Sequence, residues 1–110
     1  MLEFDSVAWS DQPPQLVAHC RLRADLASFR GHFPSRPLLP AVSQLLIVQD
    51  LAARRWGPIV AASRFKFIAP LVPGDTLTVR ITPRAASRLD VEIIKQENVA
   101  TKGTLTVAEP

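Results

Sequence analysis

Hydrophobic and polar residues alternate along most of this chain. Between Gln15 and Arg23 every second residue is apolar or small, whereas the residues between them are mostly polar or charged. A period of two is typical of a β-strand with one buried face. The same period recurs at 59–67, 76–82, 89–93 and 99–107. Phe4, Val7 and Trp9 indicate an additional short strand or an N-terminal arm.

One segment breaks this alternation. From Ala41 to about Trp56 apolar residues cover more than half of a helical circumference, which predicts a long helix covered by other parts of the structure. Arg54 and Arg55 complement the negative end of the helix dipole, and Gly57-Pro58 ends the helix.

The strands after Pro58 follow one another through short turns, so they are predicted to form an antiparallel meander. Within 59–67 the alternation places Ser63, Phe65 and Phe67 on one face, with Arg64 and Lys66 on the other. The sequence therefore predicts an α+β fold in which a curved antiparallel sheet packs on one long helix. A length of 110 residues fits a single domain, residues 1–110.

Composition narrows the possible functions. Apolar residues make up 47% of the chain and charged residues 21%, as in folded globular proteins. The net charge is +3, but the basic residues are scattered, which disfavours nucleic-acid binding and still suits an acidic protein partner. With Cys20 as the single cysteine and His19 and His32 as the two histidines, neither a disulfide nor a metal site is predicted. No run resembles a signal peptide or reaches membrane-spanning length, so we expect a soluble cytoplasmic protein.

A proline-rich loop precedes the helix. Pro34, Pro37 and Pro40 recur every third residue and exclude both helix interior and central strand. The loop is therefore extended and stiff, and it carries His32, whose imidazole titrates near neutral pH. It ends at the unpaired amides of the helix N-terminus. This pairing is the main functional signal in the sequence.

Two motifs carry a family resemblance. Gly31-His32-Phe33-Pro34-x-x-Pro37-x-x-Pro40-Ala41-Val42 resembles the signature GHFPxxPxxPGV of the 3-hydroxyacyl-acyl-carrier-protein dehydratases. Arg64-Phe65-Lys66, followed by Pro70-Leu71-Val72-Pro73-Gly74-Asp75, is similar to that family's RFKxPVxPGD segment. The tract 39–45 is most similar to the small dehydratases of aryl-polyene clusters. The resemblance implies the hot-dog fold.

The resemblance also implies a mechanism. His32 matches the base that removes the proton next to the thioester carbonyl, and the backbone N–H of Ala41 matches the group that binds the carbonyl oxygen. Family members form dimers in which the histidine and the acid come from different subunits. The substrate is carried by acyl carrier protein, whose 4′-phosphopantetheine arrives with it, so no cofactor of the chain's own is expected.

Other residues of the same motifs are expected to bind substrate: Gly31, Phe33, Pro40, Val42 and Leu46. Arg30 and Arg36 either meet the pantetheine phosphate or the acidic helix of the carrier, or are ordinary solvated arginines.

Two positions depart from the family pattern. The family has Glu or Asp fourteen residues after the histidine, and Leu46 stands here instead. Ala41 replaces the glycine of the motif, which keeps the amide and adds a methyl group. Asp50 lies one turn beyond Leu46 on the same face. It either reaches the site as a substitute acid or pairs with Arg54 on the surface.

Three functional hypotheses follow. The first is a dehydratase acting on carrier-bound acyl thioesters in fatty-acid or aryl-polyene type biosynthesis, as a homodimer. The second is a non-catalytic hot-dog subunit that binds carrier protein or forms a heterodimer with an active dehydratase, where His32 could serve a composite site. The third is an acyl thioesterase, with Asp50 directing water, because fold alone does not choose between these reactions.

Overall fold

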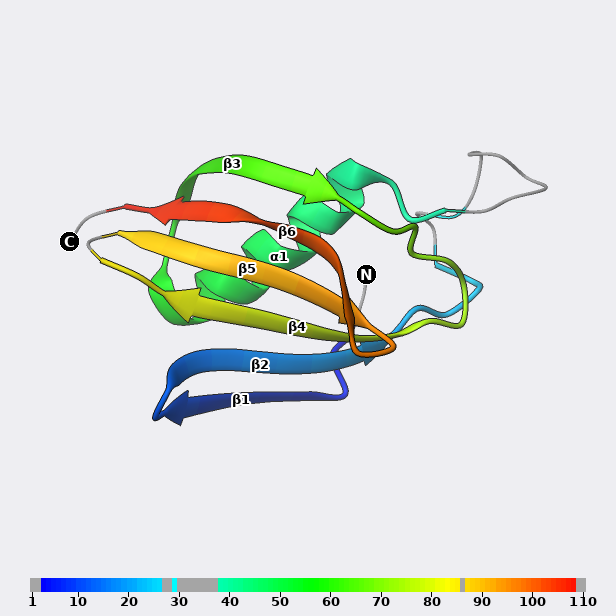
Figure 1. Cartoon of the computed structure of the whole chain (residues 1–110), viewed down its shortest axis with the longest axis horizontal. Coiled ribbons are helices and arrows are strands. Elements are labelled where there is room, and N and C mark those ends of the chain that lie inside the picture. The colour runs from blue at the N-terminus through cyan, green and yellow to red at the C-terminus, as the bar shows by residue number, and fades with distance from the viewer. Residues whose placement is uncertain (1–2, 27–28, 30–37, 86, 109–110) are drawn as a thin grey trace.

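The computed structural model describes residues 3–26, 29, 38–85 and 87–108. These residues form one helix and six strands. The elements in chain order are β1 (Ser6–Asp11), β2 (Pro14–Arg21), α1 (Ala41–Trp56), β3 (Ile59–Phe67), β4 (Thr76–Pro83), β5 (Arg88–Lys95) and β6 (Asn98–Val107). The strands make a single sheet, and α1 runs diagonally across one of its faces (Figure 1). The predicted strands and helix are thus present, including the short first strand.

The strand order is β1-β2-β4-β5-β6-β3, with every neighbouring pair antiparallel. The predicted meander is therefore correct only for β4, β5 and β6. The prediction was wrong for β3, which pairs with β6 at the edge, while β4 pairs with β2. Residues 68–75 form the crossover from β3 to β4. Where the chain leaves the sheet edge, the N–H groups of Ile68 and Ala69 both donate to the carbonyl of Ala100.

The hydrophobic core lies between the sheet and one side of α1. On β2, β4 and β5 the predicted alternation holds, because every second residue is buried. On α1 the buried residues are Gln44, Val48, Leu51 and Ala52, which mark the side that faces the sheet. The core residues from the strands are Leu16, Ala18, Cys20, Leu77, Val79, Ile81, Leu89, Val91, Ile93, Ala100 and Leu105.

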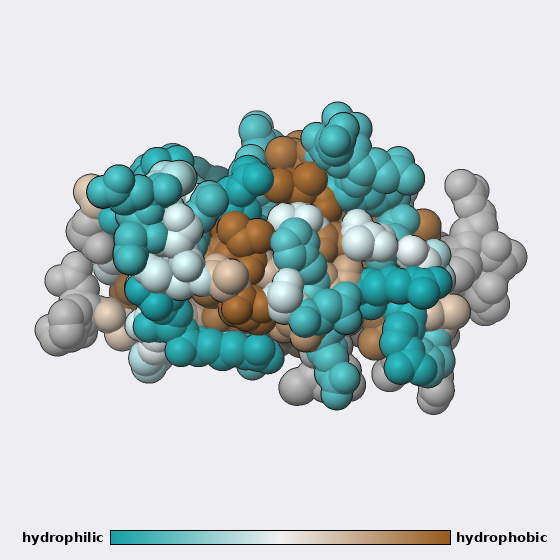
Figure 2. All heavy atoms as spheres, turned by 90° about the horizontal axis from the view of Figure 1, so that it is seen from below, coloured by the Kyte–Doolittle hydropathy of each residue, from teal (hydrophilic) through white to brown (hydrophobic). Residues whose placement is uncertain are grey.

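Two stretches of apolar surface remain outside this core. Val42 and Leu46 on α1 are 62% and 61% exposed, and Val60, Phe67 and Ile68 at the β3 edge are also exposed. The sheet of this chain therefore covers one side of the predicted apolar helix and leaves the other side open. Figure 2 views the molecule from the β1 edge and shows hydrophobic surface in the middle of that face, bordered by hydrophilic residues.

A β-bulge corrects the predicted faces of β3. The pairing with β6 is regular from Ala61↔Thr106 to Ser63↔Thr104 and resumes at Lys66↔Lys102. Between them, Arg64 has a left-handed backbone with φ of 57°. The extra residue reverses the alternation, so Ser63 and Lys66 share one face. Phe65 lies over Gly103, where a side chain on that glycine would overlap its ring. The sequence pattern had grouped Ser63 with the phenylalanines.

The C-terminal end of α1 is held by aromatic and basic residues. The Arg55 guanidinium lies 3.5 Å from the centre of the Trp9 ring, and Trp9 meets Trp56 edge to face. Gly57, with φ of 81°, ends the helix by donating its N–H to the carbonyl of Ala53. The left-handed conformation at this position favours glycine. Cation–π contact and a C-terminal glycine thus fix the helix end against β1.

Cys20 supplies a test of the core. Its side chain is fully buried, and burial, followed by the negative charge of Asp5, raises the pKa of the thiol from 9.0 to about 11. The unfolded thiol therefore ionises first as the pH rises. Burial of the neutral thiol therefore makes a pH-dependent contribution of about 3 kcal/mol to the free energy of unfolding. We expect this contribution to be fully present below pH 9 and to be lost between pH 9 and pH 11.

Urea unfolding between pH 8 and pH 11 measures this dependence, with Cys20→Ala as the control because that variant has no thiol to titrate. An identical alkaline decline in both proteins would contradict a buried neutral thiol.

Candidate active site

The N-terminus of α1 is the described part of the predicted site. Pro40 is the N-cap residue with an extended backbone, and its carbonyl accepts the first helical hydrogen bond from the N–H of Gln44. Among the residues that the structure describes, no side chain caps this end of the helix, and the first turn holds no acidic residue. The N–H groups of the first turn have no partner within a helix, and they carry the positive end of its dipole. The Ala41 amide is thus suited to bind a carbonyl oxygen that gains negative charge.

Val42, Leu46, Asp50 and Arg54 form one row along α1, each one turn after the last. The first two present apolar surface to solvent. Asp50 accepts a hydrogen bond from Arg54 at 2.9 Å, and both side chains are 49% exposed. A rise of 1.5 Å per residue puts Leu46 about 8 Å along the axis from Ala41, and Asp50 about 14 Å. Asp50 therefore lies on the predicted face of α1. Its carboxylate is paired with Arg54, and it lies one helical turn further from Ala41 than Leu46 does.

Gln44 fixes the start of the helix to the sheet. Its side-chain amide donates to the carbonyl of Leu39 at 3.2 Å, and its oxygen accepts from the Thr101 hydroxyl at 2.6 Å. Gln44 and Thr101 are both buried. Leu39 also donates its N–H to the carbonyl of Leu71. The residues just before Ala41 are thereby tied both to β6 and to the 68–75 segment.

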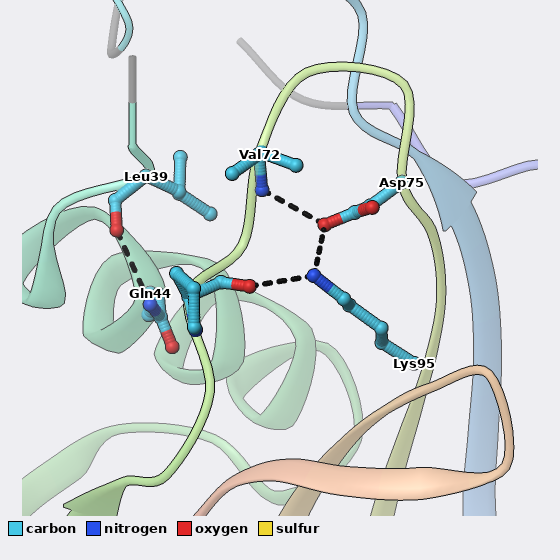
Figure 3. A network of polar contacts seen from close by, with 6 residues as sticks. Leu39, Gln44, Val72, Asp75 and Lys95 are labelled. Carbon is cyan, nitrogen blue, oxygen red and sulfur yellow. Dashed lines mark hydrogen bonds and ion pairs between the residues drawn. The ribbon is translucent and has the colours of Figure 1, made fainter. Parts of the chain in front are cut away.

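The 68–75 segment is held by a second polar network (Figure 3). Pro73 and Gly74 occupy the centre of a β-turn closed by the Asp75 N–H and the Val72 carbonyl, and Gly74 has φ of 93°, which favours glycine. The Asp75 carboxylate accepts from the Val72 N–H at 2.8 Å and from Lys95 Nζ at 3.0 Å. Lys95 also donates to the Pro70 carbonyl at 2.7 Å. These contacts explain why a Pro-Gly-Asp sequence belongs beside the site.

Several predicted site residues fall outside the described residues: Arg30, Gly31, His32, Phe33 and Arg36. The other histidine, His19, is exposed on β2, where its Nδ1 lies 3.1 Å from the Thr78 hydroxyl. Among the residues that the structure describes, no group of three or more His, Cys, Asp or Glu could hold a metal ion. Within the same part of the chain, no helix is long and apolar enough to cross a membrane.

Comparison with known proteins decides the family. The family model of the ApeI-like dehydratases matches residues 8–104, which is most of the chain. The chain belongs to the ApeI-like dehydratase family. The hot-dog fold and the dehydratase resemblance of its two motifs are thereby confirmed.

Curated and solved relatives agree with this membership. The 3-hydroxyacyl-[acyl-carrier-protein] dehydratase FabZ of Clostridium kluyveri is 31% identical over 98% of this chain and 76% of its own length. The structure of the dehydratase heterocomplex ApeI:P from Xenorhabdus doucetiae matches with a TM-score of 0.85 and 27% identity, covering 99% of both chains. An uncharacterized protein from Erwinia carotovora matches with a TM-score of 0.74 and 26% identity, over 98% of this chain and 94% of that one.

In this ApeI-like chain the sequence motifs identified the helix start and the Pro-Gly-Asp turn, but sequence reasoning missed two supporting residues. For Gln44 a signal was present, because a glutamine among apolar helix residues indicates a buried hydrogen-bond partner. Lys95 ends β5 on the same side as the buried Leu89, Val91 and Ile93, opposite Leu77, and nothing local in the sequence identifies its partners. Its role depends on the 68–75 segment returning to it in space.

The Gln44 contacts predict a measurable coupling. Gln44→Leu leaves the Thr101 hydroxyl buried without its acceptor, so the free energy of unfolding should fall by about 1–3 kcal/mol. Adding Thr101→Val removes the orphaned hydroxyl, and the double variant should lose less than the sum of the two single losses. Urea unfolding of the four proteins measures this. Strict additivity would show that the two side chains act independently.

Proposed function

We propose that this chain is one subunit of a hot-dog 3-hydroxyacyl-acyl-carrier-protein dehydratase, and that its dehydration site is completed by an acid from a partner subunit. The observation that carries this proposal is Leu46, at the position where the resemblance places the acid. Family membership and the FabZ relatives support the dehydratase chemistry. The proposed substrate is an acyl thioester held by acyl carrier protein, in fatty-acid or aryl-polyene type biosynthesis.

The proposed chemistry divides between base, oxyanion donor and acid. His32 removes a proton from the carbon next to the thioester carbonyl. The carbonyl oxygen gains negative charge as the enolate forms, and the Ala41 N–H at the positive end of the α1 dipole stabilises it. The hydroxyl on the next carbon then leaves as water, which requires a proton. Leucine has none to give.

The exposed surface supports an obligatory partner. Val42 and Leu46 lie on the open side of α1, and Val60, Phe67 and Ile68 lie along or beside the free β3 edge. Large exposed apolar surface is typical of subunit interfaces. The solved dehydratase ApeI:P from Xenorhabdus doucetiae is a heterocomplex. A second hot-dog subunit with an intact Glu or Asp would cover this surface and supply the acid, while 4′-phosphopantetheine arrives on the carrier.

A non-catalytic role is the second candidate, favoured by the same leucine. In that case the chain binds a partner or the carrier and His32 contributes nothing to turnover. The thioesterase hypothesis has weaker support. Its candidate for directing water is Asp50, which is paired with Arg54 and lies about 6 Å further along the axis than Leu46.

Restoring the acid tests the proposal directly. We expect the chain alone to dehydrate a 3-hydroxyacyl carrier-protein thioester very slowly, and Leu46→Glu to raise the rate by about 10²–10⁴-fold, the usual contribution of a general acid. Loss of water is followed by mass spectrometry of the carrier-bound acyl group. Leu46→Gln is the control, because it matches glutamate in shape and cannot donate the proton.

Mixing with a partner subunit completes the experiment. Product should form when wild-type chain is combined with an acid-bearing hot-dog subunit whose own histidine has been removed, and His32→Ala in this chain should abolish it. Equal rates for the wild-type chain alone and for Leu46→Glu would contradict a missing acid. Turnover that survives His32→Ala would favour the non-catalytic role, and release of free acid would indicate a thioesterase.

A further inference from the structure

The sheet face turned away from α1 carries an unusual arrangement of charge. Leu89, Val91 and Ile93 are buried against the helix side, so the residues between them, Asp90 and Glu92, point to the opposite face. Cross-strand pairing extends this outer face to Lys102 and Thr104 on β6 and to Lys66 on β3. In Figure 1 this is the face toward the viewer, with α1 behind the sheet.

The outer face is hollowed where these strands meet. The hollow encloses about 360 Å³, and side chains from β3, β4, β5 and β6 line it together with the residue that follows β4. We call it the basic hollow and define it by Arg64, Lys66 and Lys102 on its β3–β6 side. Its β4–β5 side is formed by Thr82, Arg84, Asp90 and Glu92.

The acidic residues of the basic hollow are already neutralised. Asp90 accepts from Arg84 at 2.7 Å, and Glu92 accepts from Arg80 at 3.1 Å. By contrast, Arg64, Lys66 and Lys102 are exposed, and no ion pair to any described residue is found for them. The charge left uncompensated on this face is therefore positive.

Two local features work against stability here. Lys66 and Lys102 are direct cross-strand partners, so two like charges stand opposite each other on the same face, and Glu92, which lies opposite Lys102 on its other side, is paired with Arg80. Arg64 adopts a left-handed backbone that is uncommon for a residue other than glycine, within the bulge that turns it toward the hollow. Opposed like charges are destabilising by themselves, and an anionic partner bound over this face would compensate them.

The shape of the basic hollow favours a protein over a small molecule. Pockets for small molecules are mostly apolar and enclose their ligand. This hollow is lined chiefly by long charged side chains on four adjacent strands, and it opens to solvent. A shallow basic surface of this width suits carboxylates spread along a protein segment, which electrostatic attraction steers into place.

We propose that the basic hollow binds the acidic surface of the acyl carrier protein. This inference rests on the proposed function for the identity of the partner, because the carrier is the acidic protein that the proposed reaction requires. The surface is distinct from Arg30 and Arg36, the arginines beside the histidine motif. In this proposal Arg64, Lys66 and Lys102 bind the carrier protein, and the chemistry takes place separately at the start of α1.

Direct binding tests the docking role without any need for turnover. The protein is titrated into fluorescently labelled acyl carrier protein at low ionic strength, and the anisotropy gives Kd. Lys66→Glu/Lys102→Glu should weaken binding by about tenfold or more, and the difference from wild type should shrink as salt is added. Arg21→Glu is compared with Lys102→Glu as a charge-matched control, because Arg21 is exposed on β2, away from the hollow. Arg21→Glu should leave Kd close to the wild-type value.

Lys66→Thr separates docking from a structural role. It removes one of two opposed like charges on the edge strand, so its Tm should equal or exceed that of wild type while its affinity for the carrier falls. A fall in both Tm and affinity would assign Lys66 to the folded framework and overturn the proposal. Equal losses from Arg21→Glu and Lys102→Glu would show only a dependence on net charge, which also overturns it.

The remaining outcomes are equally decisive. No binding of the carrier by the wild-type chain, or unchanged binding by Lys66→Glu/Lys102→Glu, rejects the docking role whatever the enzymatic result. A change in oligomeric mass of that variant would show that the face contacts another subunit instead, and it would also reject docking. If the carrier binds through these residues while no assembly dehydrates its cargo, docking stands and the proposed function fails.

Discussion

The attachment of the start of α1 to the sheet is the contact on which the rest of the site depends. A helix amide stabilises charge only if its N–H is held where that charge develops. Gln44 ties the helix to Leu39 behind it and to Thr101 on β6, and Leu39 is tied in turn to Leu71. Each link is a buried or partly buried hydrogen bond, which is expensive to leave unmade. The position of Ala41 is therefore a property of the whole fold.

The crossover between β3 and β4 supports the same attachment, because it contacts the residues just before α1. Residues 68–75 pass from one edge of the sheet to its middle, and they run beside both Leu39 and the end of β2. The Leu22 and Gly74–Asp75 backbones exchange two hydrogen bonds, and the Asp75–Lys95 pair anchors the turn from the other side. A strand that had followed β3 in a simple meander would have left the helix start without this support.

Sequence reasoning predicted most elements because their signals are local. A period of two identifies the strands, and Gly57 ends the helix through its own backbone. The position of β3 at the edge of the sheet was not predictable, because pairing with β6 joins residues about forty apart in sequence, as in Ser63↔Thr104. The bulge at Arg64 escaped the pattern for a related reason. One inserted residue reverses which side chains face the helix, and a prediction from strict alternation does not include such an insertion.

In the candidate site, too, local features were predictable and long-range contacts were not. Ala41, Leu46 and Asp50 could be placed on α1 from helical spacing alone, and the structure supplies what spacing lacks, namely the Asp50–Arg54 pair and the exposure of Leu46. Gln44 and Lys95 were missed because their partners are distant in sequence. A residue's chemistry is read from its type, whereas its partners depend on the fold.

The exposure of Leu46 means that the residue at this position can vary while the fold is kept. Within a single chain this side chain packs against little, so its identity is free to change without opening a cavity in the core. The helix start, the Gln44 contacts and the Pro-Gly-Asp turn are independent of it. In the proposed dimer the two sites then become unequal. The site that joins His32 of this chain to the partner's acid is complete, whereas the site that contains Leu46 has no proton donor.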